Sequence, residues 1–270
     1  MAKKADSSLV SVTNWSPNNS GKRVYSLTRV SVHCVVGQCA AASLGTMFAN
    51  PNFEASSNYG IGYDGKIGQY VSESDRSWCT SSYDNDNRAI TIEVASDTFA
   101  PYKVKNAAYK ALIKLLVDIC KRNKKKKLLW FGDKTKSLNY KPKSDELVMT
   151  VHRWFANKSC PGDYLYNLHG TIAAEVTKQL SGRTTATTAK PTTTTTTKPT
   201  TMAFTPYIVH NNVPDLNIRK GPGTNYPVVT MINGGAYTIV AESDGKGAKK
   251  WGKLKSGVGW IALDYCTKVK

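Results

Sequence analysis

Hydrophobic positions recur with two different periods in the first part of the chain. Apolar and polar residues alternate in short runs rich in β-branched side chains, which predicts strands at 30–36, 67–71 and 89–95. Elsewhere apolar residues return every three or four positions, which predicts helices at 40–49, at 106–123 with Asn106 as N-cap, and at 165–180 before Gly182. Strands that alternate with helices predict an α/β domain with a central mixed β-sheet flanked by helices.

Residues 203–270 follow a different pattern. Short apolar runs are separated by Gly, Pro and Asn, which predicts a small all-β barrel; the runs lie at 216–218, 228–229, 237–240, 251–254 and 259–261. The segment Asn-Ile-Arg-Lys-Gly-Pro-Gly-Thr at 217–224 and the closing Gly-Trp-Ile at 259–261 resemble the signature of bacterial SH3-like domains. That resemblance implies a domain that binds the cell wall.

A threonine-rich tract separates the two patterns. Twelve of the eighteen residues 184–201 are Thr, and the others are two Ala, two Lys and two Pro. Such a tract cannot bury a core, so it predicts a linker. We therefore expect an N-terminal domain at 1–181, a linker at 182–202 and a C-terminal domain at 203–270.

The charge changes the choice of partner. The chain carries 37 Lys and Arg against 19 Asp and Glu, a formal net charge of +18. The excess is +10 in residues 1–181 and +8 in 182–270, and so broad a basic character favours a polyanionic partner. Nucleic acid and the teichoic acid phosphates of a cell wall both qualify. The basic residues are not concentrated in one element and no nucleic-acid-reading motif is present, so we expect no nucleic acid partner.

One segment holds the strongest candidate chemistry. His152 and Cys160 lie eight residues apart, which on one helix would separate them by roughly 12 Å. A zinc ion needs its ligands about 2.0–2.3 Å away, so a loop must fold back between the two, and the turn-forming pair at 161–162 fits this. His33, in a predicted strand, is the best third ligand. Three protein ligands plus a water are typical of catalytic zinc.

Four stretches together resemble a known family. They are Val-His-Cys-Val-Val-Gly-Gln-Cys at 32–39, Ser-Ser-Asn-Tyr-Gly-Ile-Gly at 56–62, Thr-Ile-Glu-Val at 91–94 and the segment 152–162. Over roughly residues 8–181 the chain is similar to the zinc-dependent N-acetylmuramoyl-L-alanine amidases, the group related to peptidoglycan-recognition proteins. Within that group it resembles bacteriophage endolysins of Gram-positive hosts.

The resemblance also implies roles for three further residues. Glu93 would be the general base, and its strand independently suggests a pocket, because only Thr91 shares its face between apolar neighbours. Lys158, two residues before Cys160, would stabilise the oxyanion. Tyr59 would line the site in an assisting or structural role. A strand glutamate that faces solvent is the alternative for Glu93.

The remaining cysteines and histidines have plainer interpretations. The first residues of the chain contain no apolar core of a secretory signal, which favours reduced thiols over disulfides. We expect Cys34, Cys39, Cys79 and Cys120 to pack rather than bind metal. Many members of the family that the chain resembles have a histidine near residue 79, where this chain has Cys79. His169 is expected to pack or to lie on the surface, His210 has no assigned role, and Trp154 and Phe155 belong either to the core or to the floor of a sugar groove.

The whole pattern predicts a peptidoglycan hydrolase. It would use Zn²⁺-activated water to cleave the amide bond between N-acetylmuramic acid and L-alanine in a Gram-positive wall, with teichoic acid as a second partner. No apolar run reaches the roughly 18 residues of a membrane span, so no membrane insertion is expected. Synthesis in a host cytoplasm and release through a holin pore would fit. A non-catalytic peptidoglycan-binding protein and a host autolysin with the same chemistry remain alternatives.

Overall fold

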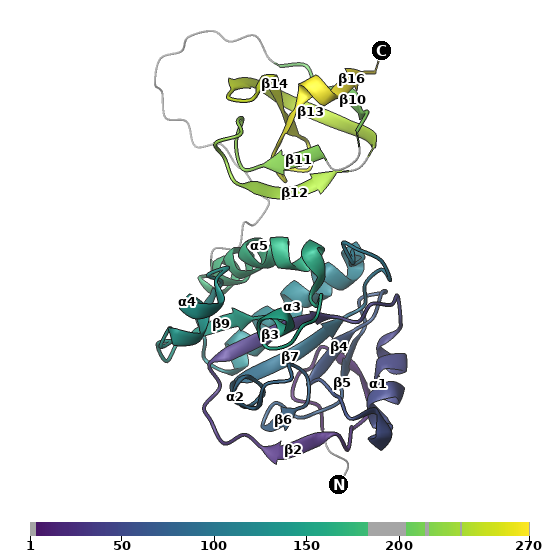
Figure 1. The fold of residues 1–270 in the computed structure, drawn as a ribbon, viewed down its shortest axis with the longest axis vertical. Helices are drawn as coiled ribbons and strands as arrows, with labels where there is room; N and C mark the ends of the chain where they lie inside the picture. The colour runs from purple at the N-terminus through teal and green to yellow at the C-terminus, as the bar shows by residue number, and fades with distance from the viewer. Residues whose placement is uncertain (1–3, 183–203, 214–215, 233, 270) are drawn as a thin grey trace. The chain divides into compact units, whose positions relative to one another are not determined.

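The computed structural model describes residues 4–182, 204–213, 216–232 and 234–269. The chain divides into two units, Met1–Thr185 and Ala186–Lys270 (Figure 1). The threonine-rich linker predicted at 182–202 lies outside the described residues, except for Gly182. Each unit is therefore described by itself.

A seven-stranded mixed sheet forms the centre of the N-terminal unit. Its order is β1-β5-β4-β7-β3-β9-β8, and its described pairs run parallel except β4 with β5. A separate antiparallel pair joins β2 to β6. The strands are β1 (Val10–Thr13), β2 (Asn19–Lys22), β3 (Arg29–Cys34), β4 (Tyr59–Ile61), β5 (Ile67–Gln69), β6 (Asp75–Ser77), β7 (Ala89–Val94), β8 (Lys127–Leu129) and β9 (Glu146–Thr150).

Two long helices cover one face of this sheet. They are α3 (Asn106–Arg122) and α5 (Gly162–Leu180), and shorter helices complete the unit at α1 (Ala41–Ala49), α2 (Tyr83–Arg88) and α4 (Lys134–Asn139) (Figure 1). The main core joins the apolar sides of α3 and α5 to Val32 of β3 and Ile92 of β7, both fully buried. Since strand side chains alternate between faces, the neighbouring residues His33 and Glu93 belong to the opposite face.

Helix α1 packs on that opposite face. Its Leu44 and Phe48 form a small core with Tyr70, beside strand β4. Gly60 of β4 allows the close approach, because a Cβ there would lie 2.6 Å from the Tyr70 ring and 2.9 Å from Leu44. The sheet therefore has a helix-covered face toward α3 and α5 and a second face that α1 covers only in part.

The predicted ends of the elements agree with the structure to within a few residues. Asn106 as N-cap is wrong, because it is the first residue of α3 and the capping position is Lys105, which makes no side-chain cap bond. Helix α5 begins at Gly162 rather than 165 and ends before Gly182, whose φ of +71° suits a residue that follows a helix. Strand β9 was not predicted, because all five of its residues are buried and show no alternation.

The C-terminal unit is all-β, which confirms the second half of the predicted fold class. Its seven strands pair antiparallel in the order β12-β11-β15-β14-β13-β10-β16, around a core that includes Ile218, Ile239 and Ile261. The strands are β10 (Tyr207–Asn211), β11 (Leu216–Arg219), β12 (Val228–Ile232), β13 (Gly235–Gly245), β14 (Ala248–Leu254), β15 (Trp260–Ala262) and β16 (Cys266–Lys268).

The described helices also test the membrane prediction. None of them combines the length and the apolar character that crossing a bilayer requires.

The packing of α3 can be tested by one truncation. Leu112 is fully buried in the main core, so Leu112→Ala should lower the free energy of unfolding by about 2–5 kcal/mol through lost contacts and a residual cavity. Lys114 is exposed on the same helix, and Lys114→Ala should change the free energy of unfolding by no more than about 0.5 kcal/mol. Denaturant unfolding measures both; equal effects would contradict the assigned core face.

Candidate metal centre

The parallel pairing of β3 with β7 positions the first two residues of the site. Their register places His33 directly beside Glu93, on the sheet face opposite the α3–α5 core. His33 Nδ1 lies 3.7 Å from Glu93 Oε1, and the imidazole is fully buried. Two strands far apart in sequence thus hold a nitrogen ligand and a carboxylate in a fixed relation.

The segment after β9 brings two more ligands to His33. A short 3₁₀ turn, His152–Trp154, begins this segment, and the Arg153 N–H donates to the Cys160 carbonyl at 3.1 Å, which folds the loop back. Cys160 Sγ then lies 3.3 Å from His33 Nδ1, and the His33 and His152 ring centroids are 5.2 Å apart. One ligand atom from each of His33, His152 and Cys160 lies within 4.8 Å of the others.

This donor set fits a zinc ion. Two imidazoles and one thiolate are ligands that Zn²⁺ prefers, and they leave a fourth position open. Burial and the neighbouring His152 hold the pKa of His33 well below its usual range, and burial with Lys158 lowers the pKa of His152, so both imidazoles stay neutral, as a ligand must. The Cys34 backbone N–H lies 3.4 Å from Cys160 Sγ and stabilises negative charge on that sulfur.

Glu93 has the surroundings of a proton-transferring group. Its side chain is 16 % exposed, and its Oε2 atom has no hydrogen-bond partner among the described residues. Burial, with a smaller contribution from Cys34, raises the pKa of Glu93 to about 8. A carboxyl group whose pKa lies near the working pH can both accept and return a proton.

Cys79 is the neighbour that sequence reasoning missed. Its thiol lies 3.9 Å from Glu93 Oε1 as a donor, and together with His33 and Glu93 it forms a second group of potential ligand atoms within 4.8 Å. Burial and the charge of Glu93 raise the pKa of Cys79 well above its usual range, so it stays a thiol. The one available signal was the departure from histidine at this position.

A pocket of about 260 Å³ opens beside these groups. Glu93 and His152 line its polar part. Its apolar part comes from helix α1 and two aromatic side chains, at Leu44, Met47, Phe48, Phe53 and Trp78. The arrangement can hold a carbon-rich group against a polar reacting end.

Lys158 lies in the loop between His152 and Cys160 and is exposed. Its positive charge contributes to the lowered pKa of His152, so the ammonium group lies within electrostatic reach of the cluster. The side chain is long and free to approach a bound anion.

The structure does not bring Tyr59 to this cluster. Tyr59 pairs with Ile92, so it faces the α3–α5 core instead of the Glu93 side. Its hydroxyl donates to Glu73 Oε1 at 2.7 Å, and Arg122 donates to the same hydroxyl at 3.4 Å. The expectation that Tyr59 lines the site is therefore corrected; the period-2 alternation of strands places it behind the sheet.

The other aromatic and titratable candidates of the N-terminal unit serve packing. Trp154 is buried and stacks on Trp130 with ring centroids 5.1 Å apart, which decides for the core over a groove floor. His169 is buried against the same Trp130 at 4.6 Å, and Cys120 belongs to the main core. His210 is exposed on β10 of the other unit.

The chain matches two family models. The model described as N-acetylmuramoyl-L-alanine amidase matches residues 15–163, and the one described as bacterial SH3 domain matches residues 214–267. No curated protein matches the chain.

Solved structures are similar to the chain at low sequence identity. A mutant endolysin from Bacillus subtilis is 18% identical with a TM-score of 0.40, over 61% of this chain and 97% of that one. A selenomethionine derivative of AmpD is 19% identical with a TM-score of 0.43, over 66% and 99%. Drosophila peptidoglycan recognition protein SD is 22% identical with a TM-score of 0.41, over 59% and 92%.

Metal analysis tests the ligand set. The wild-type chain should bind about one zinc ion. Cys160→Ser or His33→Ala should weaken zinc binding by more than about 100-fold, because loss of a residue that only hydrogen-bonds to a ligand already lowers metal affinity by about 10–100-fold. Cys266→Ser, which removes a thiol of the other unit, is the matched control. Zinc content by atomic absorption after dialysis decides; full retention in Cys160→Ser would reject the site.

Proposed function

The chain belongs to the N-acetylmuramoyl-L-alanine amidase family, and from that premise we propose that it is a zinc-dependent peptidoglycan hydrolase of the endolysin type. It would cleave the amide bond between N-acetylmuramic acid and L-alanine and so lyse a Gram-positive cell. The observation that carries this proposal is the meeting of His33, His152 and Cys160 within 4.8 Å, beside the mostly buried Glu93.

Each residue has a defined task in this reaction. A zinc ion held by His33, His152 and Cys160 would lower the pKa of a bound water and polarise the substrate carbonyl. Glu93 accepts the proton of the attacking water and returns it to the leaving nitrogen of L-alanine. Its pKa of about 8 suits both steps. Lys158 brings a positive charge to the oxygen that becomes negative as the tetrahedral intermediate forms.

Cys79 supports Glu93 in the same reaction. Its S–H group donates toward Oε1, while Oε2 has no partner among the described residues. The carboxylate is therefore held from one side and has one oxygen available for the water. The apolar walls of the 260 Å³ pocket would hold the substrate and exclude solvent from the reacting bond.

The hydrolytic machinery favours catalysis over binding alone. A protein that only binds peptidoglycan needs neither a thiolate ligand nor a buried carboxyl group with a raised pKa. This chain has a candidate sulfur ligand in Cys160 and a carboxyl group with a raised pKa in Glu93. We therefore prefer the hydrolase to the non-catalytic alternative.

The C-terminal unit would hold the enzyme on the wall. The match to the bacterial SH3 family supports this, and the net charge of +18 supports teichoic acid phosphates as a second attraction. A threonine-rich tether would keep a bound enzyme close to many bonds and raise the effective substrate concentration. A phage origin and holin-dependent release complete the proposal.

Product analysis on purified peptidoglycan tests the reaction. The expected result is new L-alanine amino termini without new reducing sugar ends, abolished by a chelator and restored by zinc. New reducing ends would instead indicate a glycosidase. Bound protein without either product would favour the binding-protein alternative.

The general base can be separated from the metal. Glu93→Ala should retain zinc but lose about 10²–10⁴-fold in turnover, the usual contribution of a positioned base. Glu175→Ala, on a half-exposed position of α5, should leave turnover unchanged. Amino-terminus release from a soluble muropeptide measures both variants; full activity of Glu93→Ala would remove Glu93 from the proposed mechanism.

Truncation tests the anchoring role. Residues 1–181 alone should cleave soluble muropeptide at the rate of the full chain, because the metal cluster and its pocket lie within that unit. The same fragment should lyse intact cells more slowly, since it lacks the wall-bound module. Turbidity loss of a cell suspension measures lysis, and equal lysis by both proteins would contradict the anchoring role.

A further inference from the structure

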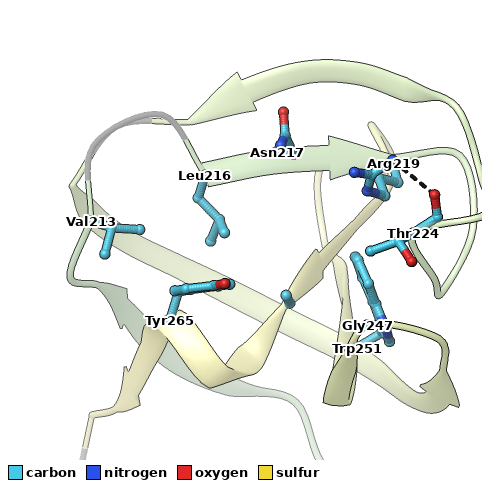
Figure 2. A pocket seen from close by; sticks show the side chains of 9 residues that line it. Val213, Leu216, Asn217, Arg219, Thr224, Gly247, Trp251 and Tyr265 are labelled. Carbon is cyan, nitrogen blue, oxygen red and sulfur yellow. Dashed lines mark hydrogen bonds between the residues drawn. The ribbon is translucent and has the colours of Figure 1, made fainter.

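The C-terminal unit contains a pocket of about 360 Å³ with two unlike ends. In Figure 2, Arg219, Thr224 and Trp251 lie toward one end, and Val213, Leu216 and Tyr265 lie toward the other. The first end is rich in hydrogen-bond donors and the second is largely apolar. Its volume falls within the usual range of small-ligand sites, about 300–1,000 Å³.

Trp251 forms a wall at the polar end. The residue is 2 % exposed, and its Nε1–H has no hydrogen-bond partner among the described residues. The indole edge next to Nε1 packs on the turn at Gly245, where a Cβ would lie 2.9 Å from Trp251 Cδ1, and Gly245 does not line the pocket. The indole therefore contributes ring surface to the pocket and not its N–H group.

Arg219 is fixed at the same end. Its Nη1 donates to the backbone carbonyls of Thr224 at 3.3 Å and Tyr226 at 2.8 Å. Among the described residues, the bonds of the guanidinium group come from Nη1, and Nε and Nη2 have no partner there. A planar guanidinium fork binds the two oxygens of a carboxylate in parallel.

The surroundings favour an anion over a cation. The described lining contains no Asp or Glu, while Asn217 and Thr224 add further polar groups beside Arg219. Gly247, at φ +89°, lets its turn approach Thr224, because a Cβ there would lie 2.3 Å from Thr224 Cγ2. The turn thereby helps to close the donor end.

The apolar end decides between two kinds of anion. Leu216 and Ala262 are buried and Tyr265 offers a half-exposed ring, so this end suits a ligand that carries a small apolar group next to its charge. A polymer of glycerol phosphates has no such group. A peptide that ends in alanine has a methyl group on the carbon that bears the carboxylate.

We propose that this pocket binds the free carboxylate end of a short peptide with small apolar side chains, such as an uncrosslinked peptidoglycan stem that ends in D-alanine. Arg219 holds the carboxylate, and the apolar end holds the methyl groups. The inference rests on the proposed function, because that function brings the chain to a cell wall. Its consequence is that the C-terminal unit distinguishes free stem ends from crosslinked ones, which lack that carboxylate.

The test uses the full chain carrying Glu93→Ala, which prevents hydrolysis, and peptidoglycan stripped of teichoic acid. Co-sedimentation measures binding, with N-acetyl-D-alanyl-D-alanine, its C-terminal amide and glycerol phosphate as competitors. The free acid should displace the protein at a concentration at least about tenfold lower than the amide or glycerol phosphate, since charge-assisted bonds to Arg219 are lost without the carboxylate.

Two variants assign the effect to the pocket. Arg219→Gln should weaken sedimentation by about tenfold or more, while the C-terminal unit stays folded by circular dichroism. Lys220→Gln removes the same charge from the exposed neighbouring residue and should bind as the parent does.

Three outcomes overturn the inference. They are equal competition by acid and amide, stronger competition by glycerol phosphate, and equal loss in Arg219→Gln and Lys220→Gln, which would indicate general charge attraction. Turnover of the wild-type chain on soluble muropeptide is measured separately. If the chain shows no turnover but the free acid still competes selectively, the proposed hydrolase function is rejected and the proposed peptide-binding pocket is retained.

Discussion

The register between β3 and β7 is the constraint on which the N-terminal unit depends. These parallel strands pair residue for residue, so His33 stands beside Glu93 on one face while Val32 and Ile92 enter the core on the other. A shift of one residue would exchange the two faces. It would bury the carboxylate under α3 and α5 and expose the apolar side chains. Folding of the core and assembly of the site are thus the same event.

The loop from His152 to Cys160 completes what the sheet begins. The backbone bond from Arg153 to Cys160 closes the loop, and the start of α5 fixes the thiol against His33. Burial keeps both imidazoles neutral, which prepares them for a metal instead of a proton. The same burial raises the pKa of Glu93. One low-dielectric environment therefore serves the ligands and the base together.

Two of the buried polar atoms that lack a hydrogen-bond partner among the described residues lie at the proposed metal centre. They are His33 Nε2 and Glu93 Oε2. Such groups carry a free-energy cost that ordinary packing does not recover. A metal or a substrate would offset it, so binding and stability are linked at this centre.

The sequence alone determined the fold class, the long helices and the identity of the potential ligands, because hydrophobic periods and motif spacing are local properties. It also suggested Glu93, since one carboxylate in an apolar strand stands out locally. The tertiary structure alone decided which residues meet. It removed Tyr59 from the cluster, because Tyr59 pairs with Ile92 and faces the other side of the sheet, and it added Cys79, because a loop returns that thiol to Glu93. Contacts between distant segments depend on strand order and register, which no local pattern encodes.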